Sequence, residues 1–181
     1  QEVRGSPKDG DLVFVVNSDG KALGRGFYNS FSQFSIRKVA LPMEPFWCDS
    51  VEDLLSYRID SANSIRNSLS LPSQATTAYR LVHGDGDYLS GLVVDVYNEL
   101  AIIQSSAFWV EKYSEIILKV VAEKLNLSKD QIIWKSLDGK LQKDMRAIEY
   151  AAIPNMHKTE SLSLSSPFIV KENGLSFQID P

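Results

Sequence analysis

The stretch from Tyr79 to Tyr97 reads YRLVHGDGDYLSGLVVDVY and decides how the second half of the chain folds. Two runs of β-forming residues, YRLVH and LVVDVY, flank a segment rich in glycine and aspartate. A nucleotide-binding turn would need a helix after the glycines to offer free N–H groups to phosphate, but a strand pattern follows. A calcium loop is disfavoured because Leu89 stands where a third oxygen ligand should follow Asp85 and Asp87. The residues therefore predict a structural connection between strands, with both aspartates capping turn amides.

The residues after this stretch predict an α+β fold in which a helix packs on one face of a sheet. A hairpin turn at Asn98 leads to a further strand, LAIIQ, and QIIWK supplies another strand later. Between these two strands, apolar residues recur at helical spacing over residues 108–126. The segment FIVKENGLSFQID predicts a hairpin that turns at the Asn-Gly pair, residues 173–174. Residues 136–166 are polar and carry no clear pattern.

A helix is also predicted before this region. Ser50 is an N-cap candidate, and Asp53, three residues later, completes a capping-box pattern. Apolar residues then recur at helical spacing until Pro72, which ends the helix. The exposed face of this helix is expected to carry four polar residues: Arg58, Asn63, Arg66 and Asn67.

Residues 10–39 predict three short strands, DLVFVV, KALGRGFY and FSIRKV. A closed barrel usually needs five or more strands, so we expect an incomplete small β-barrel. The glycines at positions 24 and 26 favour a bend or a close approach of another backbone. Residues 1–43 hold six Lys/Arg against four acids, whereas the whole chain of 181 residues has a net charge of -4. An acidic balance argues mildly against a chain whose main task is to bind a phosphate backbone, although a local basic face remains compatible with it.

The segment GRGFYNS offers the best functional candidates from residue chemistry. Arg25 offers a fork for phosphate, Tyr28 a stacking face and Asn29 an amide that can read a base edge. Arg37 lies on the following strand. The alternative is an ordinary bent strand with Tyr28 in the core and Arg25 solvated. This mixture of residues is the one that RNA recognition uses.

No catalytic or metal-binding constellation is visible. His83 and His157 are far apart in sequence without a Cys-x-x-Cys pair beside them, so a zinc site is disfavoured. Cys48 is the single cysteine and has no histidine nearby in sequence. We find no P-loop and no Gly-x-Ser-x-Gly elbow in the sequence. We also find no glycine-rich strand-to-helix turn of the kind that binds S-adenosylmethionine. We therefore assign no catalytic, cofactor-binding or metal-binding residue, and no run of about 18 apolar residues suggests a membrane span.

Three segments resemble one known family. GRGFYNSFSQFSIR, the stretch YRLVHGDGDYLSGLVVDVY and the hairpin SPFIVKENGLSFQID together are similar to the first part of the S-adenosylmethionine-dependent large-subunit rRNA (cytosine-C5) methyltransferases. Those proteins consist of a PUA domain, a central α+β domain and a methyltransferase domain. The resemblance implies an incomplete PUA-like β-barrel over residues 1–43, a linker with an amphipathic helix over 44–76, and a central α+β domain over 77–181. The methyltransferase domain, with its cofactor motif and catalytic cysteines, would lie beyond Pro181.

The sequence departs from the family pattern in several places. The family usually has Glu, Gly and Pro where this chain has Asp85, Tyr88 and Ser90. A family segment with Arg-Ser-Asp and later basic residues is represented only by WKSLDGKLQKDMR, which puts RNA contact there in doubt. The opening PUA strand is also missing, and Cys48 matches neither catalytic cysteine.

The resemblance implies that this chain positions ribosomal RNA for a parent enzyme that uses S-adenosyl-L-methionine. The residues expected to contact RNA are Arg25, Tyr28, Asn29, Ser32 and Arg37. Two alternatives stay open: a non-catalytic adaptor that binds a protein, and a stand-alone RNA-binding module. We expect a cytoplasmic location in a bacterium, with plastid or mitochondrion as the eukaryotic alternatives. No membrane partner is expected, and the oligomeric state is open, a homo-oligomer included.

Overall fold

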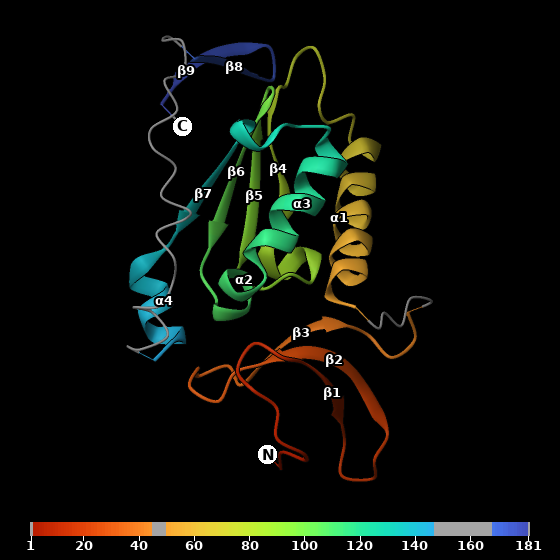
Figure 1. Ribbon diagram of the computed structural model, residues 1–181. Coiled ribbons are helices and arrows are strands. Elements are labelled where there is room, and N and C mark those ends of the chain that lie inside the picture. The colour runs from red at the N-terminus through yellow and green to blue at the C-terminus, as the bar shows by residue number, and fades with distance from the viewer. Residues whose placement is uncertain (1, 45–49, 147–167, 181) are drawn as a thin grey trace.

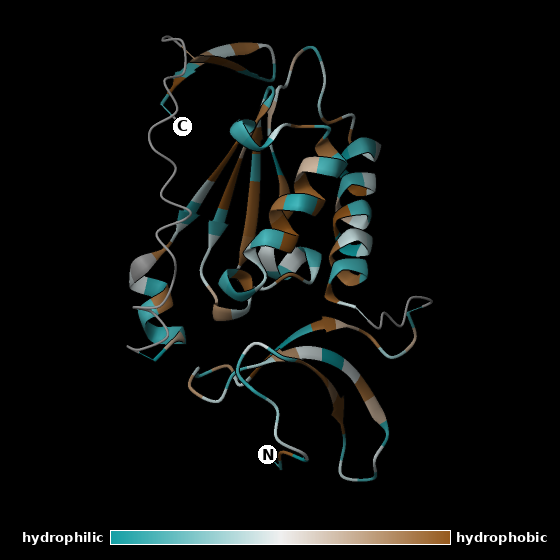
Figure 2. Cartoon of the chain, viewed as in Figure 1, coloured by the Kyte–Doolittle hydropathy of each residue, from teal (hydrophilic) through white to brown (hydrophobic). Residues whose placement is uncertain are grey.

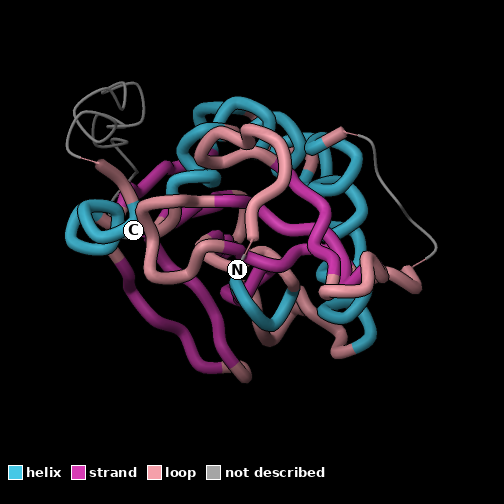
Figure 3. Tube along the Cα trace, turned by 90° about the horizontal axis from the view of Figure 1, so that it is seen from below, coloured by secondary structure: helices cyan, strands magenta, loops and turns pink. Residues whose placement is uncertain are grey.

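The computed structural model describes residues 2–44, 50–146 and 168–180, which form a mixed α+β protein (Figure 1). A three-stranded N-terminal sheet lies against one end of a larger α/β layer, and a two-stranded hairpin lies at the other end. Seen from below, the N-terminal sheet covers the end of the α/β layer (Figure 3). The predicted α+β class is confirmed. Within these three ranges, no helix combines the length and the apolar character that crossing a bilayer requires.

The N-terminal sheet confirms the three strands predicted from residues 10–39. Its antiparallel strands, in the order β1-β2-β3, are β1 (Leu12–Val16), β2 (Ala22–Tyr28) and β3 (Ile36–Ala40). The turn between β1 and β2 is fixed by Asn17, whose Oδ1 accepts hydrogen bonds from the backbone N–H groups of Asp19 and Lys21 at 3.0 and 2.8 Å. Such side-chain bonds to nearby backbone are what make asparagine a turn residue.

The two glycines of β2 allow β3 to lie directly against it. Gly24 has φ +136, and a Cβ atom at this position would run into the carbonyl oxygen of Ala40. A Cβ atom on Gly26 would lie 2.6 Å from Cγ2 of Ile36. The predicted close approach of another backbone is therefore confirmed, and the approaching strand is β3.

Replacing Gly24 with alanine is expected to lower the free energy of unfolding by roughly 2 kcal/mol or more, because positive φ and a backbone clash both oppose a Cβ atom. Gly139→Ala is the matched control, since no atom lies within 4 Å of its Cβ and its backbone is helical. That control should be neutral or stabilise by up to about 1 kcal/mol. Urea unfolding measures the free energy of unfolding of both variants. Equal changes for Gly24→Ala and Gly139→Ala would contradict this account of β2.

The α/β layer is built on a four-stranded sheet with the order β4-β5-β6-β7. Its strands are β4 (Ala78–His83), β5 (Leu92–Tyr97), β6 (Leu100–Ser105) and β7 (Ile132–Ser136). The first three pair antiparallel, whereas β6 and β7 are parallel. Parallel neighbours cannot be joined by a tight turn, so a helical connection runs between β6 and β7. All four strands were predicted in sequence, including the hairpin turn at Asn98.

Two helices, α1 (Val51–Ser68) and α3 (Ser114–Leu125), cover one face of this sheet (Figure 1). Hydrophobic residues concentrate on the strands and on the helix sides that face them (Figure 2). The main core includes fully buried Leu55 and Ile59 of α1, together with Ile103 of β6. On the opposite face of the sheet, Leu100, Ile102 and Ile133 form a smaller buried cluster. The predicted packing of helix on one sheet face is thus observed.

Helix α1 begins as predicted but buries a residue that we expected to be exposed. The Oγ of Ser50 accepts a hydrogen bond from the backbone N–H of Asp53 at 3.1 Å, which confirms the N-cap. The expectation that Arg58 lies on the exposed face was wrong. Its guanidinium is buried, donates to both carboxylate oxygens of Glu44 at 2.8 and 2.6 Å, and donates to the carbonyl oxygen of Val39.

The single helix predicted over residues 108–126 is two helices, α2 (Phe108–Lys112) and α3, which meet at Tyr113. Tyr113 leaves helical geometry with ψ 21. Its ring lies 5.7 Å from that of Phe27 on β2, so packing against the N-terminal sheet coincides with the break. Helical spacing of apolar residues cannot reveal such a tertiary contact.

The glycine-rich segment of the quoted stretch is a single 3-10 turn, η1 (Gly84–Asp87), and strand β5 follows it. Asp87 accepts a hydrogen bond from the backbone N–H of His83 at 2.6 Å and pairs with Arg66 through bonds of 2.7 and 2.8 Å. The predicted structural connection is confirmed, as is the capping role of Asp87. Asp85 is exposed and makes no side-chain hydrogen bond within the three described ranges.

The remaining elements lie at the two ends of the layer (Figure 1). They are η2 (Lys129–Gln131), α4 (Asp138–Asp144), β8 (Phe168–Glu172) and β9 (Leu175–Ile179). Strands β8 and β9 form the predicted hairpin, with Asn173 and Gly174 at positive φ. The backbone N–H of Thr77 donates to the carbonyl oxygen of Lys171 at 2.8 Å, which attaches this hairpin to the segment before β4.

Candidate functional site

The five residues predicted to contact RNA come from one continuous part of the N-terminal sheet. Arg25 and Tyr28 lie on β2, Asn29 and Ser32 in the loop that follows it, and Arg37 on β3. The loop faces α4 and the end of the α/β layer (Figure 1). Three of the five side chains form hydrogen bonds within the protein: those of Asn29, Ser32 and Arg37. The side chain of Arg25 is buried against the ring of Phe14.

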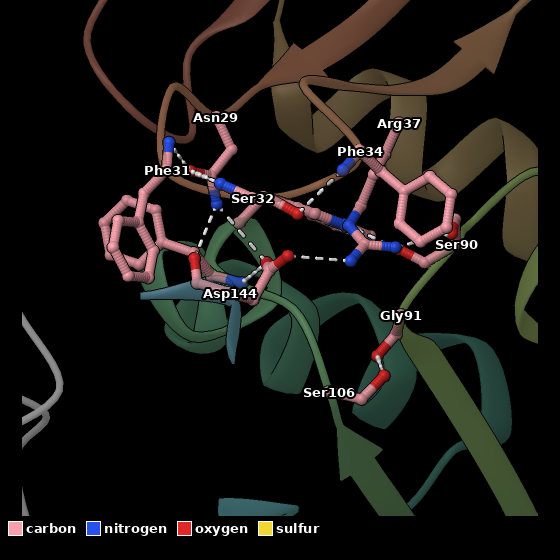
Figure 4. A network of polar contacts seen from close by, with 11 residues as sticks. Asn29, Phe31, Ser32, Phe34, Arg37, Ser90, Gly91, Ser106 and Asp144 are labelled. Carbon is pink, nitrogen blue, oxygen red and sulfur yellow. Dashed lines mark hydrogen bonds and ion pairs between the residues drawn. The ribbon is translucent and has the colours of Figure 1, made fainter. Parts of the chain in front are cut away.

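Asp144, the last residue of α4, is the centre of a polar network that joins the N-terminal sheet to the α/β layer (Figure 4). Its carboxylate accepts a hydrogen bond at 2.8 Å from Nη2 of Arg37 and another at 2.8 Å from the backbone N–H of Phe108. The Nδ2 of Asn29 donates to the backbone carbonyl of Asp144 at 2.7 Å. Because both Asp144 and Asn29 are buried, these bonds are shielded from water and replace lost hydration.

Ser90, which precedes β5 in the stretch quoted above, extends this network within the contact between the N-terminal sheet and the α/β layer. Its Oγ accepts a hydrogen bond from Nη1 of Arg37 at 3.0 Å, and its carbonyl oxygen accepts one from Nε1 of Trp109 at 2.7 Å. The ring of Trp109 stacks on Phe27 with centroids 4.3 Å apart and an angle of 6° between the planes. Polar and aromatic contacts thus fix β2 and β3 to the start of α2.

A separate, solvent-accessible ion pair also connects the N-terminal sheet to the α/β layer. The Nζ of Lys112 on α2 lies 2.7 Å from a carboxylate oxygen of Asp11, just before β1. This hydrogen bond lowers the pKa of Asp11 below its usual value, because it favours the ionised carboxylate. The pair is solvent-accessible, so its contribution to stability is small.

The loop between β2 and β3 is shaped by its own side chains. The Oδ1 of Asn29 accepts hydrogen bonds from the backbone N–H groups of Phe31 and Ser32 at 3.0 and 3.1 Å. The Oγ of Ser32 accepts a bond from the backbone N–H of Phe34 at 3.2 Å. In these bonds the side-chain oxygens of Asn29 and Ser32 accept hydrogen bonds from the backbone of their own loop. The rings of Phe31 and Phe34 are left 47% and 66% exposed.

Arg25 has two guanidinium nitrogens without a hydrogen-bond partner among the described residues, whereas Arg37 has one. The residue is only 8% exposed, and its guanidinium carbon lies 4.8 Å from the ring centre of Phe14. Its Nε and Nη1 atoms are buried without a hydrogen-bond partner among the described residues. An ionised group in this state is costly unless an anion reaches it. The alternative interpretation, a solvated Arg25 with Tyr28 in the core, is wrong for Arg25.

Tyr28 is half-buried and lines a groove of about 1210 Å³ on the open face of the N-terminal sheet. Apolar side chains of all three strands and the segment from Glu2 to Pro7 line the same groove. The apolar lining includes Val13, Val15 and Ile36. Tyr28 therefore presents a ring and a hydroxyl to a partly apolar surface.

Helix α4 was missed in the sequence, because residues 136–166 showed no clear pattern. Its signal is short: Leu141 and Asp144, three residues apart, are buried, whereas Lys140 and Lys143 are exposed. Beyond the helix, Arg146 donates to the Oγ of Ser30 at 2.8 Å and brings this segment to the β2–β3 loop. A seven-residue helix carries too few residues for a periodicity to stand out.

The described residues show no metal-ligand cluster, and the strand-to-helix connection after β6 is not rich in glycine. Across the described ranges, no three His, Cys, Asp or Glu side chains come together as metal ligands do. An S-adenosylmethionine site of the nucleotide-binding kind needs a glycine-rich strand-to-helix turn. The strand-to-helix connection after β6 consists of Ser106 and Ala107. Cys48 and His157 lie outside the described residues.

Comparison with known proteins finds relatives of this chain among ribosomal RNA large subunit methyltransferases. Residues 1–39 match the family model of the PUA-like domain. The chain is 27% identical over 181 residues to ribosomal RNA large subunit methyltransferase I of Shewanella denitrificans, covering 97% of this chain and 41% of that protein. It is 31% identical over 153 residues to the "putative ribosomal RNA large subunit methyltransferase MJ1653" of Methanocaldococcus jannaschii, covering 84% of this chain and 36% of that protein. The chain is therefore homologous to these methyltransferases, and it spans about two fifths of their length.

A solved structure shares the fold. That of SMU.776, described as "a putative methyltransferase complexed with SAH", matches with a TM-score of 0.64 and 17% identity, over 96% of this chain and 41% of that chain. The PUA-like N-terminal region and the homology to large-subunit rRNA methyltransferases, both expected from sequence, are confirmed.

Proposed function

We propose that this chain is the RNA-positioning portion of an S-adenosylmethionine-dependent methyltransferase that modifies C5 of a cytosine in large-subunit ribosomal RNA. The observation that carries the proposal is the alignment with a large-subunit rRNA methyltransferase. It covers 97% of this chain at 27% identity. The match of residues 1–39 to a PUA-like domain supports a role in holding RNA. In the proposed division of labour, the methyl donor binds in another part of the parent protein, and this chain binds and orients the substrate.

Within this proposal, Arg25 and Tyr28 contact the RNA directly. Arg25 has buried donors without a partner in the described residues, and a phosphate oxygen is the anion that would satisfy them. Tyr28 offers a ring at the groove of the open sheet face. Asn29, Ser32 and Arg37 act on RNA through the loop that they hold, because the side chains of Asn29 and Ser32 and both Nη atoms of Arg37 already bind the protein itself.

Arg25→Leu is expected to leave the free energy of unfolding unchanged or higher, because it removes a buried guanidinium whose Nε and Nη1 have no hydrogen-bond partner among the described residues. The same variant should bind single-stranded rRNA fragments roughly 3- to 10-fold more weakly, with a salt slope shallower by about 0.7, the value for one lost phosphate contact. Fluorescence anisotropy between about 50 and 200 mM salt measures both quantities. Unchanged affinity together with an unchanged slope would exclude Arg25 from the RNA contact.

Arg58→Leu is the matched control for this variant. Arg58 is equally buried, but its donors are bound to Glu44 and to the carbonyl oxygen of Val39. Its removal leaves Glu44 without its partner, so the control should lose several kcal/mol of stability. RNA affinity per folded molecule should stay that of the wild type.

A second experiment tests the division of labour. The isolated chain is expected to transfer no methyl group from radiolabelled S-adenosylmethionine to rRNA, because in this proposal the methyl donor binds in another part of the parent protein. The isolated chain should still bind the rRNA fragment. Incorporation of label by this chain alone would show that the assignment of roles is wrong.

A protein-binding adaptor is the second candidate function. It is favoured by the terminal hairpin, on which Ile169, Leu175 and Phe177 are exposed large apolar side chains. Exposed apolar residues that cluster on one element often mark a contact with another polypeptide surface. Salt-dependent RNA binding by the chain supports the first candidate, whereas its absence would leave the adaptor as the better explanation.

A further inference from the structure

We propose that a single-stranded RNA segment crosses one particular surface, formed by the β2–β3 loop and by α4. We call it the loop–α4 surface and define it by four exposed residues: Phe31, Phe34, Lys140 and Lys143. This inference rests on the proposed function and names where on the chain the RNA strand lies. None of these four was among the residues predicted from sequence to contact RNA.

The two phenylalanines are exposed, and side chains of the loop fix the backbone that carries them. The backbone N–H of Phe31 is bound to Asn29, and that of Phe34 is bound to Ser32. Phe34 also lies against Arg37, with the guanidinium carbon 5.7 Å from the ring centre. Because the backbone is fixed, both rings are available for stacking without a large loss of loop entropy on binding.

The two lysines lie on the same side of α4. They are three residues apart, which places them on one helix face, and Lys140 lies one turn before the buried Asp144. Within the part of the chain that the structure describes, neither Lys140 nor Lys143 forms an ion pair. Both charges are therefore free to meet a phosphate backbone, in a chain whose net charge is -4.

Asp144 holds the two halves of the surface together. Its carbonyl oxygen accepts the hydrogen bond from Asn29, at the start of the loop, and its carboxylate accepts one from Arg37, just after the loop (Figure 4). Arg146 adds a contact to Ser30. The rings and the lysines thus belong to one connected arrangement rather than to two independent segments.

The chemistry of this surface fits single strands better than duplexes. Exposed aromatic rings stack on unpaired bases of any sequence, and neighbouring lysines bind the phosphates between them. In an A-form duplex the bases are paired and stacked, so the rings would have no base face to contact. We therefore expect binding of unpaired rRNA segments with little dependence on base identity.

Two double variants that remove contacts, and a third that keeps the stacking rings, test the surface in the whole 181-residue chain. Phe31→Ala with Phe34→Ala should weaken binding of a single-stranded RNA oligonucleotide by at least about tenfold, because each lost stacking contact corresponds to roughly 5- to 100-fold. Lys140→Gln with Lys143→Gln should make the salt slope shallower by about 1.4, the value for two phosphates. Phe31→Trp with Phe34→Trp keeps the stacking faces and should retain the affinity of the wild type.

Matched controls come from the opposite end of the molecule (Figure 1). Phe177→Ala removes an exposed phenylalanine from β9, and Lys129→Gln removes an exposed lysine from η2. Neither should change the affinity or the salt slope. Thermal unfolding of all variants confirms that each is folded, since the replaced side chains are exposed.

The outcomes separate this inference from the proposed function. If the wild-type chain binds RNA but both double variants bind as tightly, with an unchanged salt slope, the loop–α4 surface is wrong and RNA binding stands. If the wild-type chain shows no salt-dependent RNA binding, the proposed function itself fails. Equal weakening of duplex and single-strand binding by the phenylalanine variant would overturn the stacking assignment.

Discussion

Asp144→Ala is expected to lower the free energy of unfolding by about 3–5 kcal/mol, the usual cost of removing one partner from a buried ion pair. The side chain of Asp144 is 5% exposed, and its carboxylate binds Arg37 and the backbone N–H of Phe108. Without it, a mostly buried guanidinium and a backbone donor both lose their acceptor. Urea unfolding followed by tryptophan fluorescence measures the change.

The control for this variant is Asp60→Ala. Asp60 also forms a short ion pair, at 2.6 Å with Lys124, but its side chain is 54% exposed. An exposed pair contributes at most about 1 kcal/mol, so this variant should unfold near the wild-type midpoint. If Asp144→Ala cost no more than Asp60→Ala, the joint between the N-terminal sheet and the α/β layer would not depend on the buried network.

Trp109→Ala is expected to cost about 3–5 kcal/mol, the range for truncating a large buried aromatic side chain. Trp109 is 2% exposed, stacks on Phe27 and donates its indole N–H to the carbonyl oxygen of Ser90. Its loss opens a cavity between β2 and α2 and leaves that carbonyl oxygen without its side-chain donor. The measurement is the same denaturant titration, followed by circular dichroism because the variant lacks one tryptophan.

A double-mutant cycle isolates the stacking contribution. Phe27→Ala and Trp109→Ala combined should cost about 0.5–1.5 kcal/mol less than the sum of the single variants, because the ring pair is lost only once. Phe177→Ala, which truncates an exposed ring on β9, should change stability by less than about 0.5 kcal/mol. Strict additivity of the first pair would show that the two rings do not act together.

The parts of the fold that depend on local chemistry were predictable from sequence. The cap at Ser50 and the hairpin turns at Asn98 and at residues 173–174 need only neighbouring residues to form. The strands of the quoted stretch were predictable because a strand pattern follows its glycines. These features are set within a few residues of chain.

The errors and omissions concern contacts between distant residues. Arg58 is buried because Glu44 and the backbone of Val39 receive its donors, and helical spacing carries no information about either. The helix break at Tyr113 coincides with packing against Phe27 of the N-terminal sheet. Sequence patterns report which face of an element is apolar, but not which distant element covers it.

The contacts made by the candidate residues could not be predicted from sequence. Sequence chemistry pointed to the β2–β3 region, yet polar groups of Asn29 and Arg37 bind Asp144, more than 100 residues away in sequence. Phe31 and Phe34 are exposed although phenylalanine is more often buried, so their exposure could not be predicted from residue type. Ser90 supplies a hydroxyl acceptor for Arg37 from a position 53 residues away in sequence.

The most direct test of the central claim, that the chain holds single-stranded RNA on the loop–α4 surface, is amide NMR of the ¹⁵N-labelled chain titrated with an rRNA oligonucleotide. The account predicts that the largest shift changes fall in residues 30–35 and 138–146, with the β8–β9 hairpin unchanged. Largest changes on the hairpin, or no changes at an RNA excess that saturates anisotropy binding, would contradict it.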